Sequence, residues 1–343
     1  MEKYNDAKGR NQEVSGISRS YVSDRMQKRI EECGNWLNFI ADCDVTKQKL
    51  AAANFCKWRF CPMCTMLKAK KDAMKIAVCM TYIAEEHRQK FIFVTLTTPN
   101  VKADKLNEEI DNYNEAFKRL IKRDEIKVMN NGYIRKLEIT YDGEPVITKE
   151  MYEKRRGYYE RRGLIVGDPN PNYDTYHPHF HVVFAVNSGY FYGGNYVEQA
   201  IWLELWRKCM RDFSITQVDV RGVTCRNDSN EMAEGYKFDA AEFAKYAAKD
   251  KDFMHSRSVF DVFYCALKGR QVLTYGGLFA EANKKLKNDE LEEYIKPDNT
   301  VYYWEIMYSW KGKEYIEEKR RELNATDKLF LARRGINTGV ADR

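Results

Sequence analysis

The sequence predicts a mixed α+β fold, because strand-like and helix-like stretches alternate along most of the chain. Strands are indicated by runs rich in β-branched and aromatic residues, at residues 91–97, 133–141, 179–185 and 215–220. Helices are indicated by apolar residues at helical spacing, at residues 106–121 and 197–209. A third observation, three cysteines within residues 56–64, predicts a metal-stabilised module ahead of these strands.

Length, charge and cysteine usage limit the class of protein. The 343 residues are enough for a sizeable core and more than one structural unit. The 57 basic and 51 acidic residues give a net charge of +6, which permits a polyanionic partner without requiring one. No run of about 18 apolar residues is present, so we expect no membrane span. Residues 1–6 contain no apolar signal segment, which predicts a cytoplasmic protein with nine reduced cysteines.

The N-terminal part of the chain changes character near Ser23. Residues 1–22 are polar and rich in serine, glycine and asparagine, so we expect a flexible leader. From Ser23 to Ile40 the apolar residues recur at helical spacing, which predicts a helix. We assign residues 23–80 to a zinc-binding N-terminal module on the evidence of the cysteines that follow.

Three cysteines form the core of that module. Cys61 and Cys64 make a tight Cys-x-x-Cys knuckle, and Cys56 lies five residues upstream. Three reduced thiols at this spacing favour tetrahedral Zn²⁺, with Cys33 or Cys43 as the fourth ligand. The alternatives are a redox-active Cys-x-x-Cys and cysteines that are simply buried as small apolar residues. A structural zinc ion would supply folding energy where large apolar residues are few.

Basic residues in two places are candidates for contact with nucleic acid. Lys57 and Arg59 lie between Cys56 and Cys61, and together with the third cysteine they favour the zinc interpretation over the redox one. Residues 149–163 mix basic and aromatic side chains, and Arg155 and Arg156 lie at their centre. That mixture is typical of phosphate contact combined with base stacking. An exposed helical insertion accounts for it equally well.

The strongest chemical signal is a histidine-rich strand. Three of the five histidines, His177, His179 and His181, fall within ten residues. Because side chains alternate along a strand, His179 and His181 share one face and the apolar residues share the other. Two such imidazoles, with Glu138 from another predicted strand, could bind a divalent ion: Mn²⁺ or Mg²⁺ by mixed ligation, or Zn²⁺. His177 is an extra or alternative ligand, and a pair of purely structural histidines is the competing interpretation.

A second chemical signal lies in residues 230–250, which have a helical pattern. Glu242, Tyr246 and Lys249 are at i, i+4 and i+7, away from the apolar stripe of that helix. A tyrosine phenolate can attack a phosphodiester, and Lys245 or Lys249 could lower its pKa. Glu242 could act as a general base on water. An ordinary surface face with a Glu–Lys pair is the alternative.

The chain changes character again after residue 268. Residues 275–277, Tyr-Gly-Gly, indicate a turn, and the charged tail from Glu314 indicates a helix. We therefore expect a mostly helical C-terminal region over residues 269–343.

Several motifs resemble, in order, those of plasmid rolling-circle replication initiators. These are the Rep proteins of the HUH endonuclease superfamily, in the group with one nucleophilic tyrosine and a nearby glutamate. The resemblance extends from Arg29 to Lys285. The motifs that carry it are Phe-Cys-Lys-Trp-Arg-Phe-Cys-Pro-Met-Cys, Phe-Val-Thr-Leu-Thr, Arg-Lys-Leu-Glu-Ile-Thr, His-Pro-His-Phe-His-Val, Glu-Phe-Ala-Lys-Tyr-Ala-Ala-Lys and Leu-Thr-Tyr-Gly-Gly.

The resemblance implies a fold and a set of roles. The fold is an antiparallel, palm- or RRM-like sheet flanked by helices, with a nicking-joining domain over residues 81–268. His179 and His181 are metal ligands, and Glu138 is less firmly a third. Tyr246 nicks one strand at the plasmid origin, keeps the 5′ phosphate and frees a 3′ hydroxyl for a host polymerase. Glu242 directs the terminating hydrolysis, and the pattern favours Cys33 over Cys43.

Other functions remain as alternatives at this stage. A relaxase or a transposase would use the same site on a transfer origin or a transposon end. A non-catalytic, zinc-containing DNA-binding protein would use the histidines only structurally. The resemblance makes origin DNA, a helicase and a second copy of the chain the candidate partners of the C-terminal region. The sequence leaves open the origin sequence, the physiological metal, and whether the protein acts as a homodimer.

Overall fold

The computed structural model describes residues 1–223, 250–295 and 297–339. The chain divides into two compact units. The first combines residues 1–70 with residues 295–343, and the second comprises residues 71–294. This division differs from the predicted segments, because both ends of the chain contribute to the first unit. Among the described residues, no helix is long and apolar enough to cross a membrane.

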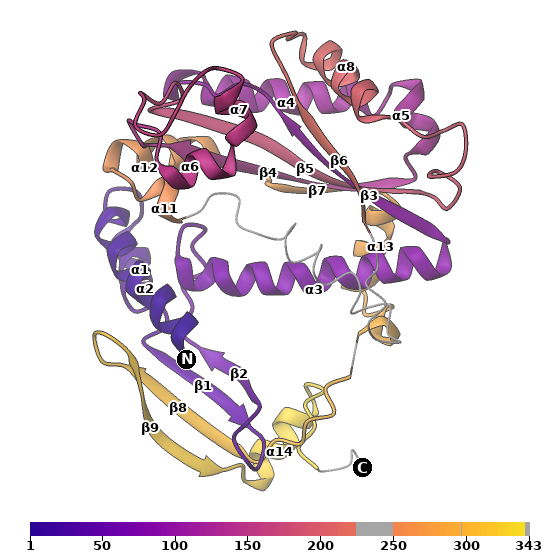
Figure 1. The fold of residues 1–343 in the computed structure, drawn as a ribbon. Helices are drawn as coiled ribbons and strands as arrows, with labels where there is room; N and C mark the ends of the chain where they lie inside the picture. The colour runs from indigo at the N-terminus through magenta and orange to yellow at the C-terminus, as the bar shows by residue number, and fades with distance from the viewer. Residues whose placement is uncertain (224–249, 296, 340–343) are drawn as a thin grey trace. The chain divides into compact units, whose positions relative to one another are not determined.

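The second unit is built on a five-stranded sheet in which every neighbouring pair is antiparallel (Figure 1). The strand order is β6-β3-β5-β4-β7. The strands are β3 (Gln89–Thr97), β4 (Gly132–Asp142), β5 (Thr175–Asn187), β6 (Val218–Val223) and β7 (Leu273–Gly277). The predicted antiparallel sheet flanked by helices is therefore confirmed. The histidine-bearing strand β5 is the central strand.

Strand β5 begins at Thr175, earlier than the residue after Pro178 where we expected it to start. A central strand forms backbone hydrogen bonds with a neighbour on each side, and proline has no N–H to donate to one of them. The pairing of β5 with β3 ends at His179, so Pro178 lies where β5 pairs with β4 alone. A proline is tolerated at such a position.

Helices cover both faces of this sheet. On one face, α4 (Leu106–Leu120) and α8 (Gln199–Met210) pack on the apolar side of β5. The Tyr113 and Phe180 ring centroids are 5.1 Å apart, and those of Phe184 and Trp202 are 5.5 Å apart. The buried residues of α4 recur at helical spacing, as its sequence predicts.

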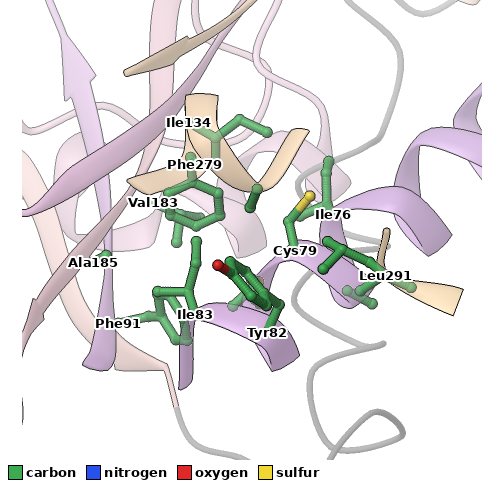
Figure 2. Packing of buried hydrophobic residues seen from close by; sticks show 14 of the residues in the cluster. Ile76, Cys79, Tyr82, Ile83, Phe91, Ile134, Val183, Ala185, Phe279 and Leu291 are labelled. Carbon is green, nitrogen blue, oxygen red and sulfur yellow. The ribbon is translucent and has the colours of Figure 1, made fainter. Parts of the chain in front are cut away.

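The opposite face packs against α3 (Pro62–Glu86) and α13 (Leu278–Lys287). Figure 2 shows Ile83 of α3 and Phe279 of α13 among the side chains that meet Phe91 and Val183 of the sheet. All four of these side chains are buried. Burying apolar area on both faces is what holds a sheet of this kind rigid.

The remaining elements among the described residues of the second unit are short. They are η1 (Ala103–Lys105), α5 (Asp124–Met129), α6 (Lys149–Lys154), α7 (Arg156–Glu160), α11 (Asp250–Phe253), α12 (Arg257–Leu267) and η2 (Glu292–Tyr294). The expected turn at residues 275–277 is wrong, because these residues end β7. Gly277, with φ +54°, closes the strand, and a Cβ there would lie 2.5 Å from the Asn131 carbonyl oxygen.

The first unit contains a four-stranded antiparallel sheet of order β2-β1-β8-β9. Its strands are β1 (Trp36–Ala41), β2 (Gln48–Ala53), β8 (Trp304–Trp310) and β9 (Tyr315–Glu322). Its helices are α1 (Glu2–Ser18), α2 (Asp24–Glu31) and α14 (Ala325–Ala332). β1 pairs with β8, so the two ends of the chain share one sheet.

Three expectations for this unit are wrong. The predicted flexible leader forms helix α1, whose Tyr4, Ala7 and Val14 are buried. The predicted helix from Ser23 to Ile40 ends at Glu31, and its second half becomes β1. The C-terminal region is not mostly helical, because β8 and β9 lie within it. In each case pairing or packing with a distant segment overrides the local pattern.

Candidate functional site

The pairing of β4 with β5 brings Glu138 directly opposite His179. Both side chains are buried, and His181 is half-buried two residues further along β5. The Nε2 atom of His181 is 3.3 Å from Oε2 of Glu138, and that of His179 is 3.9 Å from the same oxygen. The three residues can present ligand atoms that all lie within 4.8 Å of one another. The structure thus brings together the three residues that we predicted as metal ligands.

The other ring nitrogens of the two histidines have partners of their own. Nδ1 of His181 lies 3.2 Å from the hydroxyl of Thr95, which faces it across the β3–β5 pairing. Nδ1 of His179 lies 3.2 Å from the carbonyl oxygen of His177. When Nδ1 donates to such partners, Nε2 is left as an acceptor. In that tautomer both Nε2 atoms are available to an ion beside Glu138, whereas without an ion Nε2 of His181 can instead carry the proton and donate to Glu138.

The protonation states of Glu138 and His179 also suit a metal. Burial alone would raise the pKa of Glu138, but the His181 hydrogen bond and the charges of His179 and Lys136 outweigh it and lower the pKa to about 2. Burial lowers the pKa of His179 to about 3, and the neighbouring His181 and His177 add to this effect. An ionised carboxylate beside a neutral imidazole is the form that binds cations.

His177 is not part of this group. Its ring stacks beside that of His179, with centroids 5.1 Å apart, but it is not among the residues whose ligand atoms converge. Burial lowers the pKa of His177 to about 4, helped by the charge of Arg155. Its carbonyl oxygen orients His179, which is a positioning contact.

The donor set fits a divalent ion with open coordination positions. Two imidazoles and one carboxylate supply three ligands, so a bound ion would retain positions for water or a phosphate oxygen. Ligands about 2.1 Å from one ion are roughly 3–3.5 Å apart, close to the 3.3 Å between Glu138 and His181. Mixed N/O ligation suits Mn²⁺ or Mg²⁺, and the imidazoles would also accept Zn²⁺.

Thr95→Val should weaken metal binding without removing a ligand. The substitution keeps the shape of the side chain but deletes the hydroxyl 3.2 Å from Nδ1 of His181. Losing such an outer contact typically costs 10- to 100-fold in metal affinity, and we expect a loss of roughly this size. Mn²⁺ titration monitored by calorimetry measures it. Thr81→Val is the matched control, because the Thr81 hydroxyl donates within α3 to the carbonyl oxygen of Ala77. Equal Mn²⁺ affinities of the two variants would contradict the role of Thr95.

The second candidate metal centre is a group of four thiols in the first unit. Cys33, Cys56, Cys61 and Cys64 form the group, and the Sγ–Sγ distances of Cys33–Cys64, Cys56–Cys64 and Cys33–Cys61 are 3.6, 3.6 and 3.5 Å. A tetrahedral ion with Zn–S bonds of about 2.3 Å would hold sulfurs about 3.8 Å apart. The group is thus slightly contracted relative to a zinc-loaded site and fits that ion.

Backbone amides approach these sulfurs as they do in thiolate sites. The Lys57 N–H donates to Sγ of Cys64 at 3.1 Å, and the Cys56 N–H donates to Sγ of Cys33 at 3.3 Å. Hydrogen bonds with Cys33 and the other thiols lower the pKa of Cys64, which favours its thiolate. Of the two candidates for the fourth ligand, Cys33 is buried in the group and Cys43 is exposed outside it. The four sulfurs form a closed set, as structural zinc sites require.

Helix α1 contributes two polar side chains to this centre that the sequence did not indicate. Lys8 is 1% exposed, and its ammonium donates to the carbonyl oxygens of Cys33 and Glu31 at 2.8 and 3.1 Å. The thiol of Cys61 is 2.9 Å from Oδ1 of Asn11. Burial lowers the pKa of Lys8, while the charges of Cys33, Cys61 and Cys56 oppose that shift. Four thiolates around Zn²⁺ carry net negative charge, which a buried ammonium offsets.

Lys8→Met should therefore lower zinc affinity by roughly 10- to 100-fold, the usual effect of losing an outer-sphere partner. Methionine fills similar space but leaves the thiolate charge uncompensated and two carbonyl oxygens without a donor. Competition with a chromophoric chelator measures the affinity. Lys3→Met, at an exposed position on the same helix, is the matched control. An unchanged zinc affinity in Lys8→Met would show that the ammonium does not stabilise the bound ion.

The predicted nucleic-acid contacts are all at the surface. Lys57 and Arg59 are exposed beside the thiol group, and Lys57 has a left-handed backbone with φ +64°. Arg155 and Arg156 are exposed next to α6 and α7, where Arg155 lies 3.5 Å from Asp142. Their positions allow contact with DNA, and the DNA-binding role remains a prediction.

The predicted tyrosine site lies outside the described residues. Tyr246, Glu242, Lys245 and Lys249 all fall within residues 224–249, so nothing in the described structure bears on their arrangement. Their roles remain predictions from the sequence.

The fold and these two groups of side chains define a class of protein: a mixed α+β protein with one set of four cysteines and one carboxylate beside two imidazoles, each able to hold a metal ion. A family model described as Replication protein matches residues 47–316. The chain therefore belongs to the Replication protein family, and the resemblance to plasmid rolling-circle replication initiators is confirmed.

Individual relatives agree with this assignment. A protein from Staphylococcus aureus called Protein rep is 39% identical over 259 residues, which cover 75% of this chain and 97% of the relative. Protein rep of Bacillus amyloliquefaciens is 33% identical over 318 residues, covering 84% of both chains. Protein rep of Streptococcus pneumoniae is 31% identical over 280 residues, covering 79% of this chain and 77% of the relative. No solved structure matches the chain.

Proposed function

We propose that this replication initiator nicks one strand of its plasmid origin in a metal-dependent reaction. The convergence of Glu138, His179 and His181 on one face of the central sheet is the observation that carries the proposal. A divalent ion bound there would withdraw charge from a scissile phosphate. The half-exposed His181 and the open coordination positions leave room for a DNA phosphate to approach.

Tyr246 is the proposed nucleophile, on sequence evidence alone. Its phenolate oxygen attacks the phosphorus, forming a tyrosine–phosphate bond while the bond from phosphorus to the 3′ oxygen breaks. The phenol proton leaves to a base, and the 3′ oxygen takes up a proton to become the primer hydroxyl. Lys245 and Lys249 would lower the pKa of the phenol by their positive charge. The products are a 5′-phosphotyrosine and a free 3′ end that a host polymerase can extend.

One assay tests this function. The zinc-loaded protein is incubated with a labelled single-stranded origin oligonucleotide and Mn²⁺, and the products are separated on a denaturing gel. We expect cleavage at one position and a fragment that migrates with the protein, neither of which should form with a scrambled oligonucleotide. An intact origin strand would favour a non-catalytic DNA-binding protein, and preferential cleavage of a transfer origin or a transposon end would favour a relaxase or a transposase.

Glu242→Ala should separate initiation from termination. If Glu242 activates the water that ends the reaction, the variant should nick at close to the wild-type rate, and its covalent complex should persist at least about tenfold longer. The measurement is the decay of the protein–DNA adduct after a chase with unlabelled strand. Glu290→Ala, an exposed carboxylate in the second unit, is the matched control. Loss of the first cleavage in Glu242→Ala would mean that this glutamate has a different role.

A further inference from the structure

A buried lysine, Lys136 of β4, lies on the same sheet face as the candidate metal centre and is 5% exposed. In the pairing of β4 with β5, Lys136 lies directly opposite His181, just as Glu138 lies opposite His179. Because side chains alternate along a strand, Lys136 and Glu138 are on the same face. Lys136 and the three candidate ligands therefore form two adjacent cross-strand pairs, at a spacing where side chains interact directly.

The other neighbours of Lys136 on this face are apolar. Along the strands the next pair is Ile134 and Val183, both buried in the core that packs against α3 and α13. On the side of β7, Leu273 pairs with Lys136 and packs against the same core. The stem of a lysine packs well on apolar side chains, whereas its ammonium is costly to bury among them. Among the described residues that the strand register places beside Lys136, Glu138 is the one with the opposite charge.

The charge of Lys136 acts on Glu138. Burial opposes ionisation of this carboxyl, but the His181 hydrogen bond and the charges of His179 and Lys136 together lower its pKa to about 2. Imidazoles that bind a metal are neutral, so in that state Lys136 contributes the positive charge of this group and Glu138 the negative one. The ammonium and the carboxylate therefore balance each other before any ion is bound. A buried carboxylate that loses such a neighbour is strongly destabilised.

A divalent ion changes this balance. The ion adds two positive charges to a group whose single carboxylate is already balanced by Lys136. Repulsion between like charges is stronger at buried positions than in water, because the effective dielectric constant is lower. Lys136 should therefore weaken ion binding. The opposite is expected of Lys8 beside the four cysteines, since the thiolates of a zinc-loaded site carry an excess of negative charge.

We propose that Lys136 controls how tightly the candidate metal centre holds its ion. In the ion-free protein, its ammonium takes the place of the ion as the counter-charge of Glu138. When a divalent ion binds, the same ammonium repels it. The proposal rests on the metal centre of the proposed function and assigns Lys136 no step of the cleavage. A site weakened in this way exchanges its ion with the solution, unlike a closed structural site.

Calorimetric titration of the full, zinc-loaded chain with Mn²⁺, in the absence of DNA, tests the proposal. Lys136→Met keeps an apolar stem but removes the charge, so this variant should bind Mn²⁺ at least about tenfold more tightly than the wild type. Lys136→Arg keeps the charge, and its Mn²⁺ affinity should stay within about threefold of the wild-type value. Lys90→Met is the matched control, because it removes an exposed lysine from β3 of the same sheet. Its Mn²⁺ affinity should equal that of the wild type.

Thermal unfolding separates this role from simple packing of the lysine stem. Without Mn²⁺, Lys136→Met should have a lower Tm than the wild type, because Glu138 loses its neighbouring positive charge. A tighter ligand stabilises the folded state more, so the same Mn²⁺ concentration should raise the Tm of the variant by more than that of the wild type. A lysine that only packs would lower the Tm equally with and without Mn²⁺. Should Lys136→Met fail to fold, Lys136→Gln, which is neutral but polar, should give the same changes in affinity and Tm.

Two results would overturn the role of Lys136 alone. They are a Mn²⁺ affinity of Lys136→Met that is equal to or weaker than that of the wild type, and a loss of Tm that does not depend on Mn²⁺. If neither the wild type nor the variant binds Mn²⁺, the metal centre is contradicted together with this role. A failure to nick DNA, with the expected changes in Mn²⁺ affinity and Tm present, would contradict the function proposed above and leave the role of Lys136 intact.

Discussion

Tyr246→Phe should abolish covalent attachment of DNA while leaving the protein folded. The change removes one hydroxyl, and phenylalanine has no nucleophilic atom to replace it. Loss of a nucleophile typically lowers turnover by several orders of magnitude, so we expect at least a 10³-fold decrease in cleavage. The protein–DNA adduct should disappear from a denaturing gel. Any residual strand breakage should produce free 5′ ends.

The control for this experiment is Tyr192→Phe. Tyr192 is 86% exposed and its ring lies near the ammonium of Lys90, outside the metal centre. That variant should nick at the wild-type rate. A covalent adduct that persists in Tyr246→Phe would transfer the nucleophile role to another residue. Zinc content and far-UV circular dichroism of both variants establish that folding is not the cause of any loss.

The convergence of His179, His181 and Glu138 was largely predictable because the two histidines obey a local rule. His179 and His181 are two residues apart in a strand, so their common face follows from the alternation of side chains. Glu138 was a weaker prediction, since its position depends on how β4 aligns with β5. That register places Glu138 opposite His179. Because the two residues lie about 40 positions apart in the sequence, no local sequence pattern indicates that they pair.

Helix α1 was missed because its inner face is partly polar. Lys8, Asn11 and Ser18 are buried together with Tyr4, Ala7 and Val14. A buried lysine and asparagine remove the apolar stripe that normally identifies an amphipathic helix. These polar groups are hydrogen-bonded to Cys33, Ile30 and Gln27, contacts that only the folded chain creates.

The C-terminal strands were missed for a different reason. β9 runs from Tyr315 to Glu322, and most of its side chains are charged and exposed. Charged residues are common on edge strands, where they prevent pairing with other molecules. The strand exists because β8 pairs with it on one side and with β1 on the other. The sequence of the charged tail, taken without its strand partners, therefore indicates a helix.

Removing the zinc ion that the four thiols would hold should unfold much of the first unit. Structural Zn²⁺ sites bind with apparent free energies of about 10–16 kcal/mol, as large as the whole stability of a typical domain, about 5–15 kcal/mol. The four thiols also lie among buried residues of α1, α2 and the sheet of this unit. After chelation, hydrogen exchange should therefore accelerate strongly in peptides from residues 24–66. Peptides from β3, β4 and β5 should change little.

Separate substitutions of Cys33 and Cys43 test this prediction further. Cys33→Ser removes one of the four converging thiols, so it should reproduce the hydrogen-exchange pattern of the chelated protein. Cys43→Ser changes an exposed residue outside the group, so this variant should retain zinc. Metal analysis of each purified variant shows whether zinc is bound. If the zinc-free protein keeps the slow exchange of the loaded one, the fold of this unit is independent of the ion, and buried apolar contacts alone stabilise it. If Cys43→Ser loses zinc, the fourth ligand is Cys43.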